Sequence, residues 1–272
     1  MKNKKALFVI LTVFILSLVG IGLWVKSKSP TSNPLATKQI TDIDYKTVYS
    51  DVKKYIGKTV KWNGRVFTEV EKDDSGIYFQ MYEGDNSDHN TLVYIPDFKE
   101  TLKEDDFVVV EARIDGLWKG KNAFNADIDA IKLVAYKVET GSKAKILAPA
   151  IKTIPINDTK DVHGFLITLD RVELAEKETR IYVRIKNTTD EEVTFFDTGS
   201  KLVQGSKQIE SEYLDNDEEL PTSVAPNVEA IGAIVFDKLA ESPTEVTLFL
   251  DRPYVKGNYS DSSDLEFKFN LQ

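Results

Sequence analysis

Residues 55–66 read YIGKTVKWNGRV, and this stretch joins the end of a helix to the beginning of a strand. Gly57 suits a helix end because glycine readily adopts the left-handed conformation that closes one. Side chains alternate between the two faces of a strand. One predicted face carries the apolar residues Val60, Trp62 and Val66. The other carries Lys61, Asn63, Arg65 and Phe67. The stretch therefore predicts a half-buried strand entered directly from a helix.

Apolar residues at helical spacing precede this stretch and predict a short amphipathic helix whose aromatic stripe packs in a core. They are Tyr45, Val48, Tyr49, Val52, Tyr55 and Ile56. Thr41 or Asp42 is expected to cap the helix, since both residue types accept hydrogen bonds from the first free amides.

Period-two segments that follow predict further strands at residues 77–82, 91–95, 107–114 and about 123–138. A turn at 73–76 and a polar loop at 84–90 separate the first of them. A short turn or helix is expected at 98–102, and a loop containing Gly116 and Gly120 before the last strands. Three strands, a small insertion and two more strands indicate a five-stranded barrel.

A helix ending in Tyr-x-Gly-Lys-x-Val-x-x-x-Gly-x-Val resembles the beginning of OB-fold domains of the tRNA-anticodon-binding-like type in exported bacterial proteins. The resemblance covers about residues 45–139. It implies a ligand-binding face on the second and third strands. The residues expected there are Lys61, Arg65, Tyr78, Gln80, Tyr82 and Tyr94. The alternative is that these aromatics only pack. Nucleic acid is not expected as a partner, because residues 45–140 carry 14 basic and 18 acidic residues without a basic cluster.

Beyond residue 158, short alternating segments predict a β-sandwich. The strands are expected at 164–169, 180–186, 192–196, 230–236, 244–250 and 265–271. The pattern Tyr182-Val183-x-Ile185-x-Asn187-Thr188, with a later Gly232-x-x-Val235-Phe236-Asp237, resembles the immunoglobulin-like (telokin-like) family of exported Gram-positive proteins. The resemblance covers about residues 160–271. Members often have Pro-Gly before the late strand, whereas here Asn227 follows Pro226; asparagine tolerates the same left-handed geometry. The resemblance implies architecture and location, with no activity attached.

The N-terminus predicts a membrane anchor. Lys2, Lys4 and Lys5 precede an uncharged run at residues 6–25, which as a helix would be about 30 Å long and would span a bilayer. A cleaved signal peptide is the alternative, but its apolar run should be shorter and should end in small residues. The lysines should keep the N-terminus in the cytoplasm and place the body outside.

The sequence thus predicts a fold that is mainly β, with a transmembrane helix (1–28), a linker (29–40), an OB barrel with a leading helix (41–140), a connection (141–158) and an immunoglobulin-like sandwich (159–272).

Catalytic and metal chemistries find little support. The chain has no cysteine and two histidines, His89 and His163. No phosphate-binding glycine loop or dinucleotide fingerprint occurs, and neither a cofactor nor a metal site is expected. Residues 150–272 carry 13 basic and 24 acidic residues, with six acidic residues near one predicted loop. These are Glu210, Glu212, Asp215, Asp217, Glu218 and Glu219, and a solvated loop is favoured over a calcium site.

Three functions remain open at this point. The first is a membrane-anchored, extracytoplasmic and non-catalytic binding or interaction protein of the bacterial cell envelope, with a protein or envelope partner. The second is a sensor or accessory subunit of a membrane complex that acts through its helix. The third is a secreted hydrolase.

Overall fold

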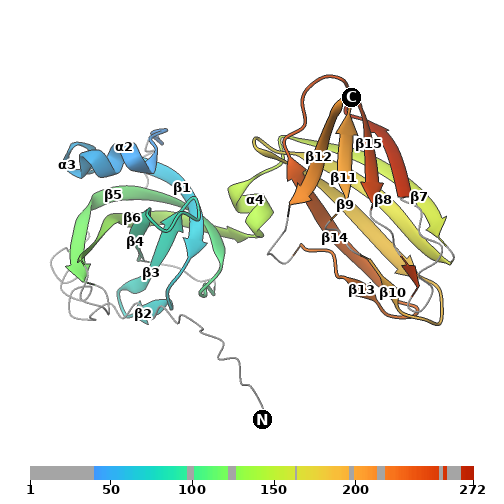
Figure 1. Cartoon of the computed structure of the whole chain (residues 1–272). Helices are drawn as coiled ribbons and strands as arrows, with labels where there is room; N and C mark the ends of the chain where they lie inside the picture. Colours follow the sequence, from blue (N-terminus) through green and yellow to red (C-terminus); the bar gives the residue numbers. More distant parts are fainter. Residues whose placement is uncertain are drawn as a thin grey trace, which may run out of the picture. The chain divides into compact units, whose positions relative to one another are not determined.

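The computed structural model describes residues 40–96, 101–121, 127–162, 164–195, 199–212, 218–250, 254–255 (backbone only) and 265–272. The protein is mainly β, as predicted, and the chain divides into two compact units between Ser142 and Lys143 (Figure 1). No helix in these ranges has the length and apolar character needed to cross a membrane. The predicted anchor at residues 6–25 lies outside the described residues.

Two short helices, α2 (Tyr45–Ser50) and α3 (Val52–Tyr55), open the first unit. The cap is Asp44, whose carboxylate accepts from the Thr47 amide at 2.9 Å. The predicted caps, Thr41 or Asp42, were wrong. The Thr41 amide instead donates a hydrogen bond to the carbonyl of Thr59, at the beginning of the first strand.

The predicted helix is interrupted at Asp51, where the backbone leaves helical geometry. The apolar stripe is therefore divided between two short helices. Three of its residues are buried, namely Tyr45, Val48 and Val52, whereas Tyr49 and Ile56 are exposed. The expectation that the whole stripe packs in the core was thus wrong at two positions.

The described part of the first unit contains six strands in one sheet. They are β1 (Thr59–Val66), β2 (Glu71–Asp73), β3 (Gly76–Glu83), β4 (Asn90–Ile95), β5 (Phe107–Lys121) and β6 (Asp127–Gly141). The order is β1-β5-β6-β4-β3-β2, and β1 also pairs with β3, so the sheet nearly closes into a barrel (Figure 1). Of these pairings only β4–β6 is parallel.

β5 is longer than predicted, and β6 begins and ends a few residues later than predicted. Gly116 and Gly120, expected in a loop, both lie within β5. The register against β6 shifts between Ile114 and Gly116, and Gly116 has a φ of 136°. A bulge of this kind bends a strand without ending it, which is why glycine here does not mark a turn. Residues 97–100, part of the predicted turn or helix, lie outside the described residues.

Closure of the barrel depends on Gly64. It pairs with Val108 of β5 on one side and with Glu83 of β3 on the other. A Cβ atom at this position would overlap the carbonyl oxygen of Tyr82, so the close approach of β1 and β3 requires glycine. The predicted alternation of β1 is confirmed: Val60, Trp62 and Val66 are buried.

The second unit begins with α4 (Lys143–Leu147) and contains eleven strands in its described part. An eight-stranded antiparallel sheet has the order β17-β15-β11-β12-β14-β9-β8-β7. Its strands are β7 (Lys152–Val162), β8 (Phe165–Leu174), β9 (Glu178–Asn187), β11 (Lys201–Gln204), β12 (Lys207–Glu212), β14 (Glu229–Asp237), β15 (Glu245–Leu250) and β17 (Leu265–Asn270). A small sheet contains β13 (Ser223–Val224), β10 (Val193–Thr194) and β16 (Tyr254–Val255).

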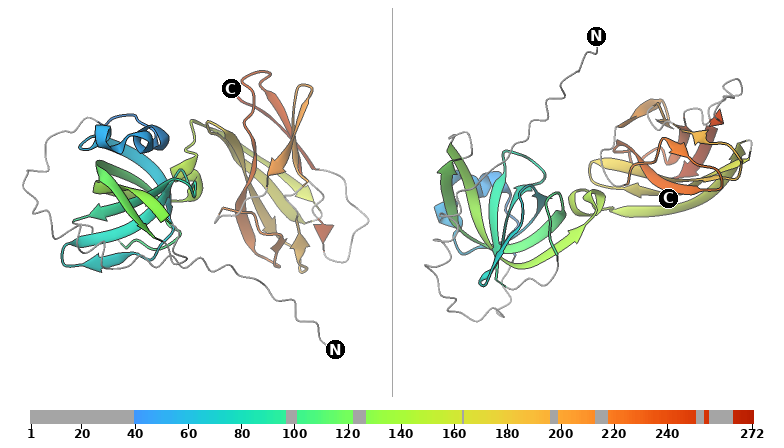
Figure 2. Two further views of the ribbon diagram at one scale, coloured as in Figure 1. Left: turned by 60° about the vertical axis from the view of Figure 1, so that its left-hand side comes forward. Right: turned by 90° about the horizontal axis from the view of Figure 1, so that it is seen from below.

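The two halves of the large sheet share one core. Among the described residues, β12 and β14 are joined by two residue pairs, Ser211 with Phe236 and Glu212 with Val235. Apolar side chains of β7, β8, β9 and β14 belong to the same buried cluster as those of β11, β15 and β17, so the halves pack as two layers (Figure 2).

The first seven residues of β7, from Lys152 to Asp158, lie within residues 141–158, which the sequence pattern assigned to a connection. It is the outermost strand of the sheet, and its register against β8 shifts between Pro155 and Asp158. Proline lacks the amide proton that a central strand needs, but an edge strand or a bulge accepts it. The proline therefore did not mark a break in the fold.

Two asparagines singled out from the sequence have clear structural roles. The buried amide of Asn187 donates to the carbonyls of Glu191, Val224 and Ala225, which fixes the end of β9. Asn227 adopts a φ of 59°, the left-handed geometry expected after Pro226.

Candidate ligand-binding region of the first unit

The predicted binding residues of β3 lie in one outward row. Ile77, Phe79 and Met81 face the barrel core, so the alternate residues Tyr78, Gln80 and Tyr82 face outward. Tyr94 of β4 is the direct cross-strand neighbour of Tyr78. The six predicted residues nevertheless separate into two groups of two, with Gln80 and Lys61 outside both.

Tyr78 and Tyr94 form a stacked pair with 4.9 Å between ring centroids. Both hydroxyls are hydrogen-bonded to Ser75. The Tyr78 hydroxyl lies 2.6 Å from Ser75 Oγ, and the Tyr94 hydroxyl donates to the Ser75 carbonyl at 2.5 Å. Leu92, Ala130 and Trp118 complete the cluster. Tyr78 is buried, which raises the pKa of its phenol. The pair therefore holds the turn at residues 73–76 and does not present a free stacking surface.

Gln80, between Tyr78 and Tyr82 in the row, is 2% exposed. Its Nε2 has no hydrogen-bond partner in the described part of the chain. Buried amides without a partner are uncommon, because the lost hydration is not recovered.

Arg65 and Tyr82 form the second group. The Arg65 guanidinium contacts Asp85 through Nε at 2.7 Å and Asp105 through Nη1 at 2.9 Å. Its central carbon lies 5.9 Å from the Tyr82 ring centroid, and Phe67 stacks on the same ring at 3.6 Å between centroids. Burial raises the pKa of Tyr82, although the charge of Arg65 opposes this.

Lys61 belongs to neither group. Its Nζ lies 3.5 Å from Glu111 of β5, its cross-strand neighbour. Lys61 is exposed, and the side chains of Arg65, Tyr82 and Tyr94 are only partly buried, so these four residues stay predicted contacts for a ligand. Tyr78 and Gln80 are covered, so the six residues do not form one open surface.

A separate groove of about 620 Å³ opens beside α2. It is lined by Tyr49, Lys119, Gly120, Lys121, Asp127 and Asp129. The charged residues are direct cross-strand pairs of the β5–β6 hairpin: Lys119 Nζ lies 3.0 Å from Asp129, and Lys121 Nζ lies 2.8 Å from Asp127. The volume lies in the usual range for small-molecule sites.

The opposite wall of the groove is the end of a stack of three rings. Tyr49 stacks on Tyr45 at 5.7 Å between centroids, and Tyr45 stacks on the imidazole of His89 at 4.4 Å. Tyr45 donates from its hydroxyl to the Asn90 carbonyl, and His89 Nδ1 lies 2.8 Å from Glu83. The pKa of Tyr45 is raised by burial, with smaller contributions from Tyr49, Glu83 and Asp129. The contacts of Tyr45 and His89 therefore fix the ring against which Tyr49 stacks at the groove.

This groove was not predicted from the sequence, for two reasons. Tyr49 was attributed to the core stripe of one continuous helix, and Gly120 to a loop. A usable signal was present: Lys119-x-Lys121 and Asp127-x-Asp129 flank a five-residue connection with matching period two. Such spacing indicates a hairpin that carries complementary charges on one face.

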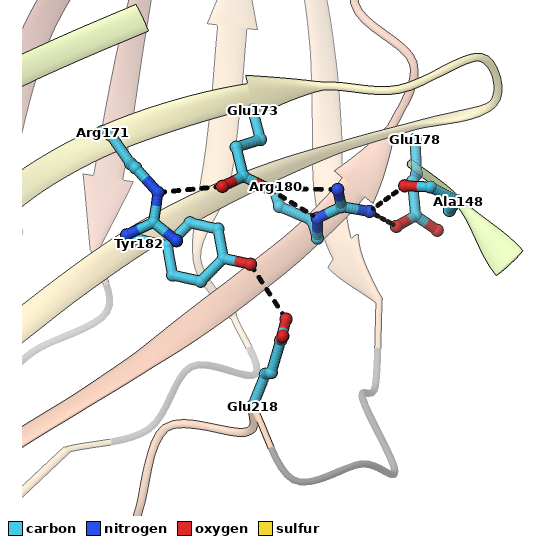
Figure 3. Close-up of polar contacts among 7 residues, drawn as sticks. All are labelled: Ala148, Arg171, Glu173, Glu178, Arg180, Tyr182 and Glu218. Atoms are coloured by element: carbon cyan, nitrogen blue, oxygen red, sulfur yellow. Dashed lines mark hydrogen bonds and ion pairs between the residues drawn. The ribbon is translucent and has the colours of Figure 1, made fainter. Parts of the chain in front are cut away.

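The second unit contains a polar cluster on the outward face of β8 and β9 (Figure 3). Arg180, 2% exposed, contacts Glu173 through Nη2 at 3.0 Å, Glu178 through Nη1 at 2.6 Å and the Ala148 carbonyl at 2.7 Å. Burial alone would raise the pKa of Glu173, but hydrogen bonds and charge from Arg171 and Arg180 hold it below its ordinary value.

Tyr182 closes this cluster. Its ring packs against the Arg171 guanidinium, and its hydroxyl donates to Glu218 Oε2 at 2.9 Å (Figure 3). Burial, with the adjacent Glu218, raises the pKa of Tyr182 to about 12. The charged groups satisfy one another, and the Arg180–Ala148 bond fixes the residues after α4 to β9. The cluster is therefore a structural one.

Neither unit presents an arrangement for metal chemistry in its described residues, where no three His, Asp or Glu side chains are grouped to hold an ion. Of the two histidines, His163 lies outside the described residues, as do Asp215 and Asp217 of the predicted acidic loop. Glu210 and Glu212 lie in β12 and not in a loop.

No family model and no curated protein matches this chain. Among solved structures, a functionally unknown protein from Listeria monocytogenes EGD-e is 12% identical and gives a TM-score of 0.36, with 46% of this chain and 88% of that one covered. The yjhA protein from Bacillus subtilis is 13% identical and gives a TM-score of 0.32, with 44% and 99% covered. Both are low scores and support no argument about function.

Proposed function

We propose that this chain is a non-catalytic binding protein of the bacterial cell envelope, anchored through residues 6–25, with both units outside the membrane. The groove beside α2 is the observation that carries the binding role. It combines an exposed aromatic ring, two Lys–Asp pairs and a volume of about 620 Å³. A few polar groups that converge on a concave surface are the common property of ligand sites.

The proposal includes the finer architecture of each unit. The circuit β1-β3-β4-β6-β5, returning to β1, supports an OB-type Greek-key barrel with β2 as an extension of the first hairpin. For the second unit, the two-layer packing and the fixed Asn187 support an immunoglobulin-like sandwich.

The binding role is tested by affinity capture from solubilised cell envelope with the full-length protein as bait. Wild type should retain an envelope component that the Tyr49→Ala variant loses. Tyr136→Ala is the matched control, because Tyr136 of β6 is 40% exposed, compared with 45% for Tyr49, and does not line the groove. Equal capture by wild type and Tyr49→Ala would remove the groove from the proposal. Protease added to intact cells should also degrade both units, and full protection would contradict the outward topology.

A further inference from the structure

The charge of the groove is balanced within the groove itself. Lys119 and Lys121 are each paired with an aspartate of the facing strand. A charged ligand would have to separate one of these pairs or leave its own charge without a partner. An uncharged ligand with hydroxyl groups avoids this cost, since each hydroxyl both donates to a carboxylate and accepts from an ammonium group.

The aspartates of the two pairs differ in exposure. The Asp129 side chain is 24% exposed and that of Asp127 is 87% exposed, whereas the side chains of Lys119 and Lys121 are 72% and 52% exposed. A ligand that enters beside Tyr49 thus meets a more enclosed carboxylate at Asp129 and a more exposed one at Asp127, with an ammonium group beside each. The atoms of each pair are separated by about the same distance as neighbouring hydroxyl oxygens of a sugar ring, so one vicinal diol can contact both members of a pair.

Tyr49 provides an apolar surface on the other wall. One face of its ring lies against Tyr45, and the ring remains 45% exposed at the groove. The face of an aromatic ring carries negative charge density and attracts polarised C–H groups. Because Tyr45 is itself fixed by His89 and Asn90, little side-chain freedom is lost when a ligand binds Tyr49.

From these observations, and resting on the binding function proposed above, we infer that the groove takes an uncharged sugar ring of an envelope glycan. The C–H face of the ring lies on Tyr49, and its hydroxyls contact the Lys–Asp pairs. A cationic ligand is disfavoured because Lys119 and Lys121 lie beside the single aromatic face. An anionic ligand, including a nucleic acid, meets Asp127 and Asp129 in a unit with 14 basic and 18 acidic residues between 45 and 140.

The test uses full-length protein in a polyoxyethylene detergent, because detergents with sugar head groups would compete. Isothermal titration calorimetry at physiological salt and mildly acidic pH, where glucosamine amines are protonated and uronates remain ionised, compares three tetrasaccharides: neutral cellotetraose, cationic deacetylated chitotetraose and anionic tetragalacturonate. The neutral glycan should bind at least tenfold more tightly than either charged one. Tyr49→Ala should weaken its binding at least tenfold, whereas Tyr49→Trp, which keeps an aromatic face, and Tyr136→Ala should bind as wild type does.

Each other result overturns the inference. Equal or tighter binding of a charged tetrasaccharide contradicts the requirement for a neutral ring. Unchanged binding by Tyr49→Ala, with wild-type circular dichroism, places the glycan elsewhere. If no tetrasaccharide binds while Tyr49-dependent capture from envelope persists, the ligand class is wrong and the proposed binding function stands. If no tetrasaccharide binds and capture from envelope does not depend on Tyr49, both the glycan inference and the binding function proposed for the groove are wrong.

Discussion

The guanidinium carbon of Arg171 lies 3.4 Å from the centroid of the Tyr182 ring, and the hydroxyl of the same tyrosine donates to Glu218. The Arg171 guanidinium covers one face of the ring, and the Glu218 carboxylate accepts a hydrogen bond from the hydroxyl at its edge. Burial of this tyrosine, together with the adjacent Glu218, raises its pKa and leads to the first of four predictions.

Alkaline pH should destabilise the second unit through Tyr182. Its folded pKa is raised to about 12, above the ordinary value of 10.0, so the neutral phenol is favoured in the folded state. The resulting stability is present below pH 10 and is lost as the pH rises from 10 through 12, by about 2 kcal/mol. Denaturant unfolding between pH 9 and 12, followed by tyrosine circular dichroism, measures the loss. Tyr182→Phe should show a smaller loss over the same range, and an identical loss would contradict this assignment.

Arg180→Met should destabilise the second unit by about 3–5 kcal/mol, because it leaves Glu173, Glu178 and the Ala148 carbonyl without their buried partner. Hydrogen exchange of β9 amides reports on this unit alone. Arg184→Met is the control: the Arg184 side chain is 41% exposed and pairs with Asp170, so its loss should have a much smaller effect. Similar effects of the two variants would refute the special role of Arg180.

Gln80→Met should stabilise the first unit by about 1 kcal/mol, since it removes a buried Nε2 that has no partner while keeping the side-chain volume. Tryptophan fluorescence follows this unit, because Trp62 and Trp118 lie in it and the chain has no tryptophan after residue 118.

The matched control for Gln80 is Gln204→Met in the second unit. The buried Gln204 amide donates to the carbonyls of Ala240 and Pro243, and its Oε1 accepts from the Ala240 amide. This substitution should cost about 2 kcal/mol or more. Destabilisation by Gln80→Met of the same size would show that Nε2 of Gln80 is bonded after all.

Gly64→Ala should disrupt closure of the barrel, because the added methyl group overlaps the Tyr82 carbonyl. We expect a loss of about 3 kcal/mol or more in the tryptophan-detected transition. Gly84→Ala serves for comparison: its Cβ would meet no atom within 4 Å, and the cost should be only the strain of a φ of 60°, about 1 kcal/mol. Equal costs for both glycines would show that close strand approach does not matter at Gly64.

Much of the strand content could be predicted because it depends on alternation within single segments. The alternation of Val60, Trp62 and Val66 survives in β1, and the segment 77–82 lies within β3. The β12 and β7 strands were missed for a different reason. One is rich in glutamate and lysine, and the other contains Pro155, so neither has the apolar pattern of a central strand.

The candidate site could be predicted only in part because it depends on which faces of the strands and helices pack against one another. Alternation placed Tyr78, Gln80 and Tyr82 on one face of β3, but no local pattern reports that other side chains then cover Tyr78 and Gln80. The groove requires α2 to lie beside the end of the β5–β6 hairpin. The break of the helix at Asp51 and the bulge at Gly116 are two departures from ideal geometry that local periodicity did not predict.

The irregular backbone of β7 affects how copies of the protein can associate when they are close together. A straight outer strand of eleven residues would offer a row of free amides and carbonyls on which a neighbouring molecule could extend the sheet. Here Pro155 removes a donor, and Asn157, at a φ of 57°, turns the ladder out of line in the middle of the strand. Copies held at high local density, as on a membrane surface, would therefore find no continuous template along this edge for building shared sheets.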